Sequence, residues 1–244
     1  MLSRIEDASL NASAPPHQLW MDGWIVHTSP GKARRARCIN AVAVGRLPVN
    51  QKLALAAATY RQAALPMVVR ITRFTQPADL DTQLDDLGWQ ALDETRVMVC
   101  QRLPSAPPAT LPAGTHWQRL DASTYAQEVG ALRGSTPEQC RAHAQRVAQS
   151  PVPYEGYAVR RNIDGQVLVC GQFAREAELV GLYDVFTRDS ARGQGLARLL
   201  CERLLSLAAS AGAEVAYLQT EADNRTARRV YERLGFADAY SYHQ

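Results

Sequence analysis

The chain has 244 residues, of which 46% are hydrophobic and 21% are charged, with a formal net charge of +3. This length allows one large domain or two small ones, and the composition excludes disordered, collagen-like and coiled-coil proteins. No apolar run approaches the roughly 18–20 residues that a membrane span needs, the N-terminus lacks the apolar core of a secretory signal, and the basic excess is too small for a nucleic-acid footprint. Five widely spaced cysteines without a CxxC pair favour reduced thiols in the cytoplasm over disulfides or a metal site.

The first hundred residues predict alternating strands and helices. Strands are expected at 37–44, 67–72 and 95–100, and helices at 50–64 and 77–87. A proline-rich stretch follows, with four prolines in the nine residues 104–112. Because such a stretch cannot lie inside a helix or a central strand, it predicts a linker over 104–115. The chain therefore divides into a first domain, 1–103, and a second domain, 116–244.

In the second domain the ends of the expected strands and helices are marked more clearly. Strands are expected at 117–120, 157–161, 167–173, 179–187, 215–220 and 236–243, and helices start at Thr136, Leu196 and Asn224. Thr136 and the proline after it form a helix N-terminus signal, and residues 162–165 are a hairpin turn signal. We expect an α/β or α+β protein with a mixed sheet.

A glycine-containing loop, Arg192-Gly193-Gln194-Gly195-Leu196-Ala197, joins the strand at 179–187 to a long amphipathic helix. Glycines let the backbone turn tightly, and the first N–H groups of a helix have no internal partners, so this junction is suited to a phosphate or pyrophosphate. The dinucleotide fingerprint does not fit, because Arg198 stands where the third glycine is required. The triphosphate P-loop string is absent from the sequence. A turn that binds nothing is the alternative for the loop taken alone.

A second element follows the loop at a fixed distance, with Asn224, Ala227, Tyr231, Gly235 and Phe236 in one pattern. This loop and this pattern occur in the order and at the spacing found in the GNAT superfamily of acetyl-CoA-dependent N-acetyltransferases, which the second domain therefore resembles. The resemblance implies a GNAT-type fold and transfer of an acetyl group from acetyl-CoA to a primary amine by direct attack. It implies no covalent enzyme intermediate and no metal.

The resemblance also assigns roles to individual residues. The loop at 192–197 would hold the coenzyme A pyrophosphate, and Val185, Phe186 and Thr187 would lend backbone groups to the pantetheine arm and the acetyl carbonyl. Asn224 would bond near the pantetheine, and Tyr231 would protonate the leaving thiolate. A neutral phenol of pKa about 10 suits a thiol of pKa about 8.5. The alternative for Tyr231 is that it only fills the apolar stripe of its helix.

The general base is less clear from the sequence. Asp184 lies in an otherwise apolar strand, so its carboxylate must be paired or used. Glu221, at the end of the next expected strand, is the rival. Their structural alternatives are an ion pair with an arginine for Asp184 and a helix N-terminal charge for Glu221. No histidine stands out.

The first domain resembles a degenerate copy of the second. When Gly88-Trp89 is aligned with Gly235-Phe236, Leu84 takes the place of Tyr231, and Pro77 that of Asn224. The glycine loop has no counterpart either, so we expect a tandem protein whose first domain does not bind the cofactor. That domain is expected to cover a sheet edge, wall the acceptor cleft or mediate formation of a homodimer. The expected acceptor is an amine on a small molecule or peptide; the alternative function is an acyl-CoA-binding regulatory or scaffold protein without turnover.

Overall fold

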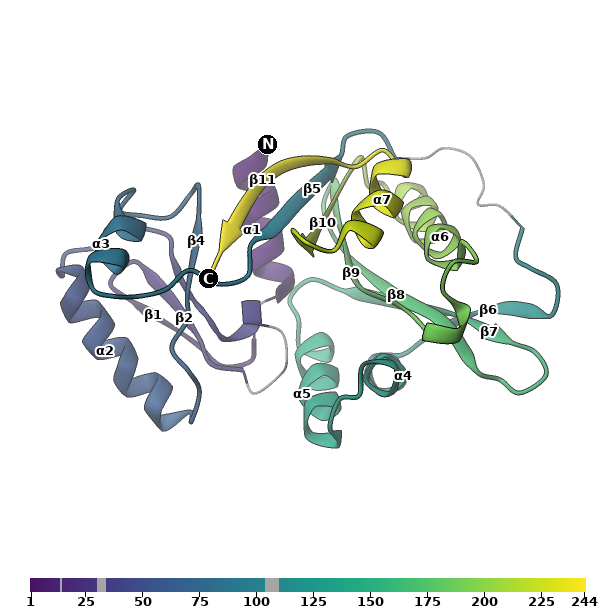
Figure 1. The fold of residues 1–244 in the computed structure, drawn as a ribbon, viewed down its shortest axis with the longest axis horizontal. Coiled ribbons are helices and arrows are strands. Elements are labelled where there is room, and N and C mark those ends of the chain that lie inside the picture. Colours follow the sequence, from purple (N-terminus) through teal and green to yellow (C-terminus); the bar gives the residue numbers. More distant parts are fainter. Residues whose placement is uncertain (14, 30–33, 104–109) are drawn as a thin grey trace.

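The computed structural model describes residues 1–13, 15–29, 34–103 and 110–244, and one continuous sheet runs through them (Figure 1). The sheet has eleven strands in the order β1-β2-β3-β4-β11-β5-β10-β9-β8-β7-β6. The expectation of a mixed α/β architecture is confirmed. Half of the predicted linker, residues 104–109 of 104–115, lies outside the described residues.

The first half contains three helices, five strands and a 3₁₀ turn in its described part. They are α1 (Leu2–Ser13), β1 (Gln18–Met21), β2 (Trp24–His27), η1 (Arg34–Arg37), β3 (Ile39–Ala41), α2 (Val49–Gln62), β4 (Val69–Thr72), α3 (Leu80–Asp86) and β5 (Thr95–Cys100). The sequence predicted the last five of these elements but not α1, β1 or β2. Serines and alanines form much of the buried face of α1, and small residues give only a weak apolar signal.

The second half follows the sequence prediction closely. Its elements are β6 (Thr115–Leu120), α4 (Ala122–Arg133), α5 (Pro137–Ala148), β7 (Tyr154–Arg161), β8 (Val167–Glu176), β9 (Leu179–Thr187), η2 (Asp189–Ala191), α6 (Leu196–Ser210), β10 (Val215–Glu221), α7 (Arg225–Arg233) and β11 (Ala237–His243). Thr136 and Gln139 form a reciprocal capping box on α5, which explains the predicted helix start. The sequence analysis missed α4. None of the helices in the described ranges is long and apolar enough to cross a membrane.

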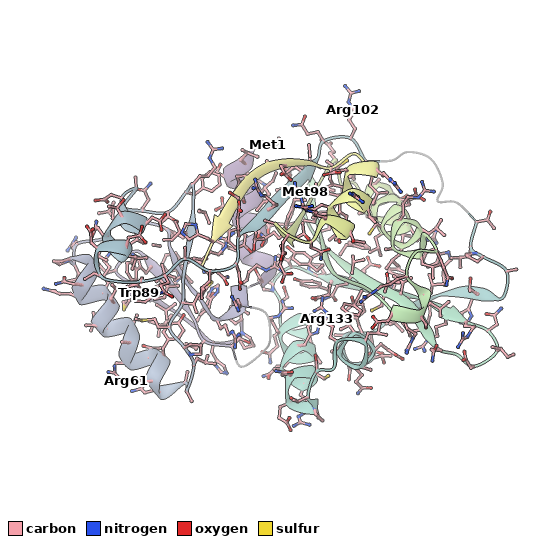
Figure 2. The ribbon with its side chains drawn as sticks, viewed as in Figure 1. Met1, Arg61, Trp89, Met98, Arg102 and Arg133 are labelled. Atoms are coloured by element: carbon pink, nitrogen blue, oxygen red, sulfur yellow. The ribbon has the colours of Figure 1, made fainter. Side chains whose placement is uncertain are left out.

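The two halves exchange their last strands (Figure 1). Strand β11 lies between β4 and β5, and β5 lies between β11 and β10. The orders β3-α2-β4-α3-β5 and β9-α6-β10-α7-β11 therefore repeat, each starting with a parallel strand pair, so the structure contains two GNAT-like units. Met98 on β5, labelled in Figure 2, is buried in the core under α6. The first half thus supplies a strand to the core of the second.

Helices cover both faces of the second half's sheet. α6 and α7 pack on one face, over a core that includes Leu200, Leu204 and Phe236. α4 packs on the opposite face, where its Tyr125 shares a buried cluster with Cys170 of β8, and α1 and its neighbours bury a further cluster there that includes Ile5. In the first half, α2 and α3 share one cluster with β2, β3 and β4.

The exchanged strands should make the two halves unfold together. Val97 on β5 is fully buried and lies opposite Gln219 of β10 and Tyr240 of β11. Val97→Ala is expected to lower the free energy of unfolding by about 2–3 kcal/mol, from lost burial plus a cavity. Tryptophan fluorescence, to which the first half contributes Trp20, Trp24 and Trp89, and far-UV circular dichroism should shift to the same lower urea midpoint. Two separate transitions would contradict this coupling.

Candidate functional site

The parallel strands β9 and β10 separate partway along their length. Their register runs from Leu179 opposite Val215 to Leu182 opposite Leu218 and ends there. Beyond that point β9 carries a bulge opposite β8, and Asp184 in the bulge has a left-handed backbone with φ +52°. A bulge bends its strand and redirects side chains. The carboxyl ends of β9 and β10 therefore diverge, leaving backbone groups of β9 outside the β9–β10 ladder.

The glycine loop stands beside this opening, at the start of α6. Gly193 and Gly195 have φ values of +76° and +75°, in a backbone region that residues other than glycine rarely adopt. A Cβ atom built on either glycine would have no protein atom within 4 Å, so the space before the loop is open. Gly195 is the N-cap residue, and Leu196 is buried and anchors the helix. The helix dipole and the N–H groups of its first turn, which have no partner within the helix, favour an anion in this open space.

Asn224 and Tyr231 lie at the two ends of α7. The Asn224 side-chain oxygen accepts a hydrogen bond from the Ala227 N–H at 3.1 Å and so caps the helix. Tyr231 is half-buried, packs against the core under α6 and meets the Phe236 ring edge-on, with ring centroids 6.1 Å apart. Burial raises the pKa of the Tyr231 phenol well above its usual value. Val185 packs against the same core cluster, so Val185 and Tyr231 share one side of the sheet, whereas the Phe186 side chain packs on the opposite side, against the α4 cluster.

Asp184 points to the other side of the sheet, toward α4 and α5. Its carboxylate accepts hydrogen bonds from Arg133 and from Gln172, both at 2.8 Å, and lies 3.2 Å from Nε2 of His143. Burial alone would raise the pKa of Asp184, but the hydrogen bond from His143 and the charge of Arg133 hold the pKa well below its usual range. The ion pair with an arginine, which the sequence left as the structural alternative, is therefore present. The rival Glu221 is exposed at the end of β10.

Sequence reasoning found neither His143 nor Arg133, the latter of which is labelled in Figure 2. Each stands alone in its helix, and both meet Asp184 only through packing of α4 and α5 against β9. Two groups of residues thus flank the opening between β9 and β10. The glycine loop and Tyr231 lie on one side, and Asp184 with His143 lies on the other.

The corresponding loop of the first half is closed. Between β3 and α2, the backbone N–H groups of Arg46 and Leu47 donate to the carboxylate of Asp22 at 2.9 and 2.7 Å. The buried Lys52 ammonium lies 3.2 Å from the same carboxylate. A Cβ on Gly45 would come within 2.1 Å of the Asp22 carbonyl oxygen. The protein's own carboxylate thus fills the position where the second half has open space.

Comparisons with known proteins agree with this geometry. Residues 126–236 match the sequence family described as "Acetyltransferase (GNAT) family". A curated relative, "Uncharacterized N-acetyltransferase YobR" of Bacillus subtilis (strain 168), is 23% identical over 223 residues, covering 90% of this chain and 88% of the relative. The fold is similar to that of a GCN5-related N-acetyltransferase from Kribbella flavida (TM-score 0.65, 17% identity, 99% and 93% coverage). It is also similar to a tandem GNAT protein from the clavulanic acid biosynthesis pathway (TM-score 0.66, 14% identity, 80% and 67% coverage).

Proposed function

Residues 126–236 form a GNAT-family acetyltransferase domain, and from this premise we propose that the protein transfers an acetyl group from acetyl-CoA to a primary amine. The protein is an acyltransferase; acetyl-CoA as donor and an amine on a small molecule or peptide as acceptor are the proposed details. The observation that carries the proposal is the open, left-handed glycine loop beside the separated ends of β9 and β10. The five unpaired cysteines support a reducing compartment, and we keep the cytoplasm as the proposed location.

The proposed donor site consists of the glycine loop and the end of β9 that has separated from β10. The loop from Arg192 to Ala197 would hold the pyrophosphate through the backbone N–H groups of Gly193, Gly195 and Ala197. The backbone of β9 from Val185 through Phe186 to Thr187 would hold the pantetheine arm and orient the acetyl carbonyl. The oxygen of Asn224 is committed to the helix cap, so its amide N–H₂ is the group that can donate to the pantetheine.

The reaction requires two proton movements. The amine nitrogen forms a bond to the acetyl carbon, the carbon–sulfur bond breaks, and the amine loses a proton while the sulfur gains one. We assign the donation toward sulfur to Tyr231, whose raised pKa keeps the phenol protonated. On the opposite side, Asp184 engages Nε2 of His143, which leaves Nδ1 as the nitrogen that can accept a proton.

We propose that Asp184 acts through His143 and does not itself accept the proton. A carboxylate whose pKa is held this low is a weak base, and its oxygens are already engaged by Arg133, Gln172 and His143. Its role is then to orient the imidazole and to stabilise the imidazolium, as a carboxylate does in other histidine–carboxylate pairs.

Asp184→Asn tests this arrangement through its pH dependence. The variant is expected to lower the free energy of unfolding by about 1–2 kcal/mol at pH 7, less than a fully buried pair because one third of the Arg133 side chain is exposed. The folded pKa is depressed, so this stability is present above the unfolded carboxyl pKa of about 3.9 and is lost as pH falls through the lower folded value. The difference between the urea midpoints of wild type and variant should therefore be constant from pH 7 to about pH 4 and should narrow progressively as the pH is lowered further. If the difference in urea midpoint between wild type and variant did not change with pH, the lowered pKa of Asp184 would be contradicted.

The proposed function is tested by a thermal melt and an acceptor screen. Acetyl-CoA should raise the melting temperature of the wild-type protein. Amines, polyamines, amino acids, aminoglycosides and peptides are then screened for release of the coenzyme A thiol. An unchanged melting curve with millimolar acetyl-CoA would rule out the donor assignment, whatever the acceptor.

A further inference from the structure

A small cavity lies between the two halves of the molecule, beside Asp184. The η1 turn of the first half forms one wall, through Ala36, and helices α4 and α5 form the others. The cavity measures ≈50 Å³. Since one water needs about 10–15 Å³ of such space, the cavity accommodates the end group of a molecule and not a whole acceptor.

Arg146 of α5 lines this cavity and is only 8% exposed. Its guanidinium lies 3.5 Å from the carbonyl oxygen of Ala12 and 5.9 Å from the centroid of the Tyr154 ring. Within the described ranges no ion pair links it to a carboxylate, whereas the buried Arg70 is paired with Glu6. A buried cation is costly unless an anion accompanies it, so Arg146 lacks the partner that its burial calls for.

A second guanidinium adds to the positive charge near the cavity. Arg35 of η1 donates to Gln219 at 2.6 Å and lies over the Tyr183 ring, 5.5 Å from its centroid. The Tyr183 ring in turn meets Tyr154, the ring beneath Arg146. The nearby carboxylate of Asp184 is already engaged by Arg133 and His143. The region therefore carries an excess of positive charge on the side of the sheet opposite the glycine loop.

We propose that this cavity binds a carboxylate of the acceptor, so that the enzyme acetylates molecules that carry both an amine and a carboxylate. This inference rests on the proposed function. The planar guanidinium of Arg146 matches a carboxylate in shape and charge, and the cavity has room for that group. Arg146 and His143 are three residues apart on α5 and so lie on one face of the helix. A carboxylate on Arg146 places the remainder of the acceptor beside His143 and Asp184, at the opening between β9 and β10.

The test compares acceptors that differ only in the carboxylate. The ω-amino acids from glycine to 6-aminohexanoate and the L-amino acids are each assayed for thiol release beside their own carboxamides, in which a neutral amide group of nearly equal size replaces the carboxylate. The proteins are wild type, Arg146→Gln, Arg146→Lys and Arg141→Gln. Arg141 lies on the same helix, is exposed and pairs with Glu138, so it serves as the control.

Wild type should prefer the carboxylates, with one chain length best. Arg146→Gln should lower kcat/KM for the preferred carboxylate by about 10–100-fold, the range for a charge-assisted hydrogen bond, and leave the carboxamide unchanged. Arg146→Lys should keep part of the preference, and Arg141→Gln should keep all of it. With coenzyme A present, the N-acetyl derivatives of the same acids should raise the melting temperature of wild type but not of Arg146→Gln, a readout that needs no turnover.

Several outcomes would overturn the inference without touching the proposed function. Acetyl-CoA would still stabilise the protein, yet carboxamides would serve as well as carboxylates, or Arg146→Gln would impair both equally. Absence of acetylation and of product binding across both series, with acetyl-CoA still bound, would also overturn it. A melting scan and a circular dichroism spectrum of each variant establish that it is folded. If Arg146→Gln does not fold, the comparison of Arg146→Lys with wild type decides the question. Failure of acetyl-CoA to bind at all would instead refute the proposed function.

Discussion

Tyr231→Phe is expected to lower kcat by about 10²–10⁴-fold, the usual contribution of a positioned proton donor. The change removes one hydroxyl and keeps the ring, so the contacts with the core under α6 and with Phe236 remain. The loss should appear in kcat and not in the affinity for acetyl-CoA, because the proton moves in the transition state. The measurement is steady-state kinetics with any amine that is turned over, together with a thermal melt with and without acetyl-CoA.

The pH dependence of wild-type kcat checks the raised pKa of Tyr231. An ordinary phenol loses its proton near pH 10, but burial raises the pKa of Tyr231, so the group stays protonated over the assay range. Wild-type kcat should therefore show no alkaline decline from this residue below about pH 10. Tyr157→Phe is the matched control, since Tyr157 packs against the same core but its hydroxyl bonds to Glu155. If Tyr231→Phe keeps a normal kcat, Tyr231 is a core residue and water protonates the thiolate.

Gly195→Val is expected to abolish the stabilisation by acetyl-CoA. At about 100 times its dissociation constant, a ligand adds about 2.7 kcal/mol to the free energy of unfolding, which corresponds to a rise of about 5–11 °C for a chain of this length. A valine at φ +75° is strained, and its side chain would extend into the open space before the loop, where the pyrophosphate is proposed to bind. The measurement is the melting temperature with and without saturating acetyl-CoA.

Backbone strain alone would also lower the melting temperature of Gly195→Val, so a second glycine is needed as a control. Gly212 follows the other end of α6 with φ +95° and likewise has no protein atom within 4 Å of its would-be Cβ. Gly212→Val should melt at a lower temperature than wild type and still gain the full shift from acetyl-CoA. Equal shifts for wild type and Gly195→Val would place the anion elsewhere.

The first half has a loop before α2 in the position that the glycine loop takes before α6 in the second half. The loop before α2 keeps a left-handed glycine, Gly45, but the Asp22 carboxylate accepts the N–H groups of Arg46 and Leu47. We infer that this internal anion takes the place of a phosphate. The first half then serves the second by contributing strand β5 to the sheet and one wall of the cavity. The sequence indicated the loss of the motif, but it did not show which group took its place.

The sequence by itself predicted the local structure of the proposed donor side. Glycine at 193 and 195, the cap residue Asn224 and the apolar stripe with Tyr231 act through the backbone and through neighbours within one turn, so their spacing predicts their placement. The strands from β6 to β11 were predicted for the same reason, because alternation and turn residues are local signals.

The proposed acceptor side was decided by the tertiary structure. Asp184, His143 and Arg133 come from β9, α5 and α4, and only the packing of those helices on the sheet brings them together. The exchange of β5 and β11 was equally invisible, since hydrogen bonds between distant strands leave no pattern in either segment. Arg146 reads in the sequence as one more basic residue of an amphipathic helix. Arg146 is buried at the junction of the two halves, and no carboxylate in the described structure forms an ion pair with it; burial of that kind arises only when the whole chain has folded.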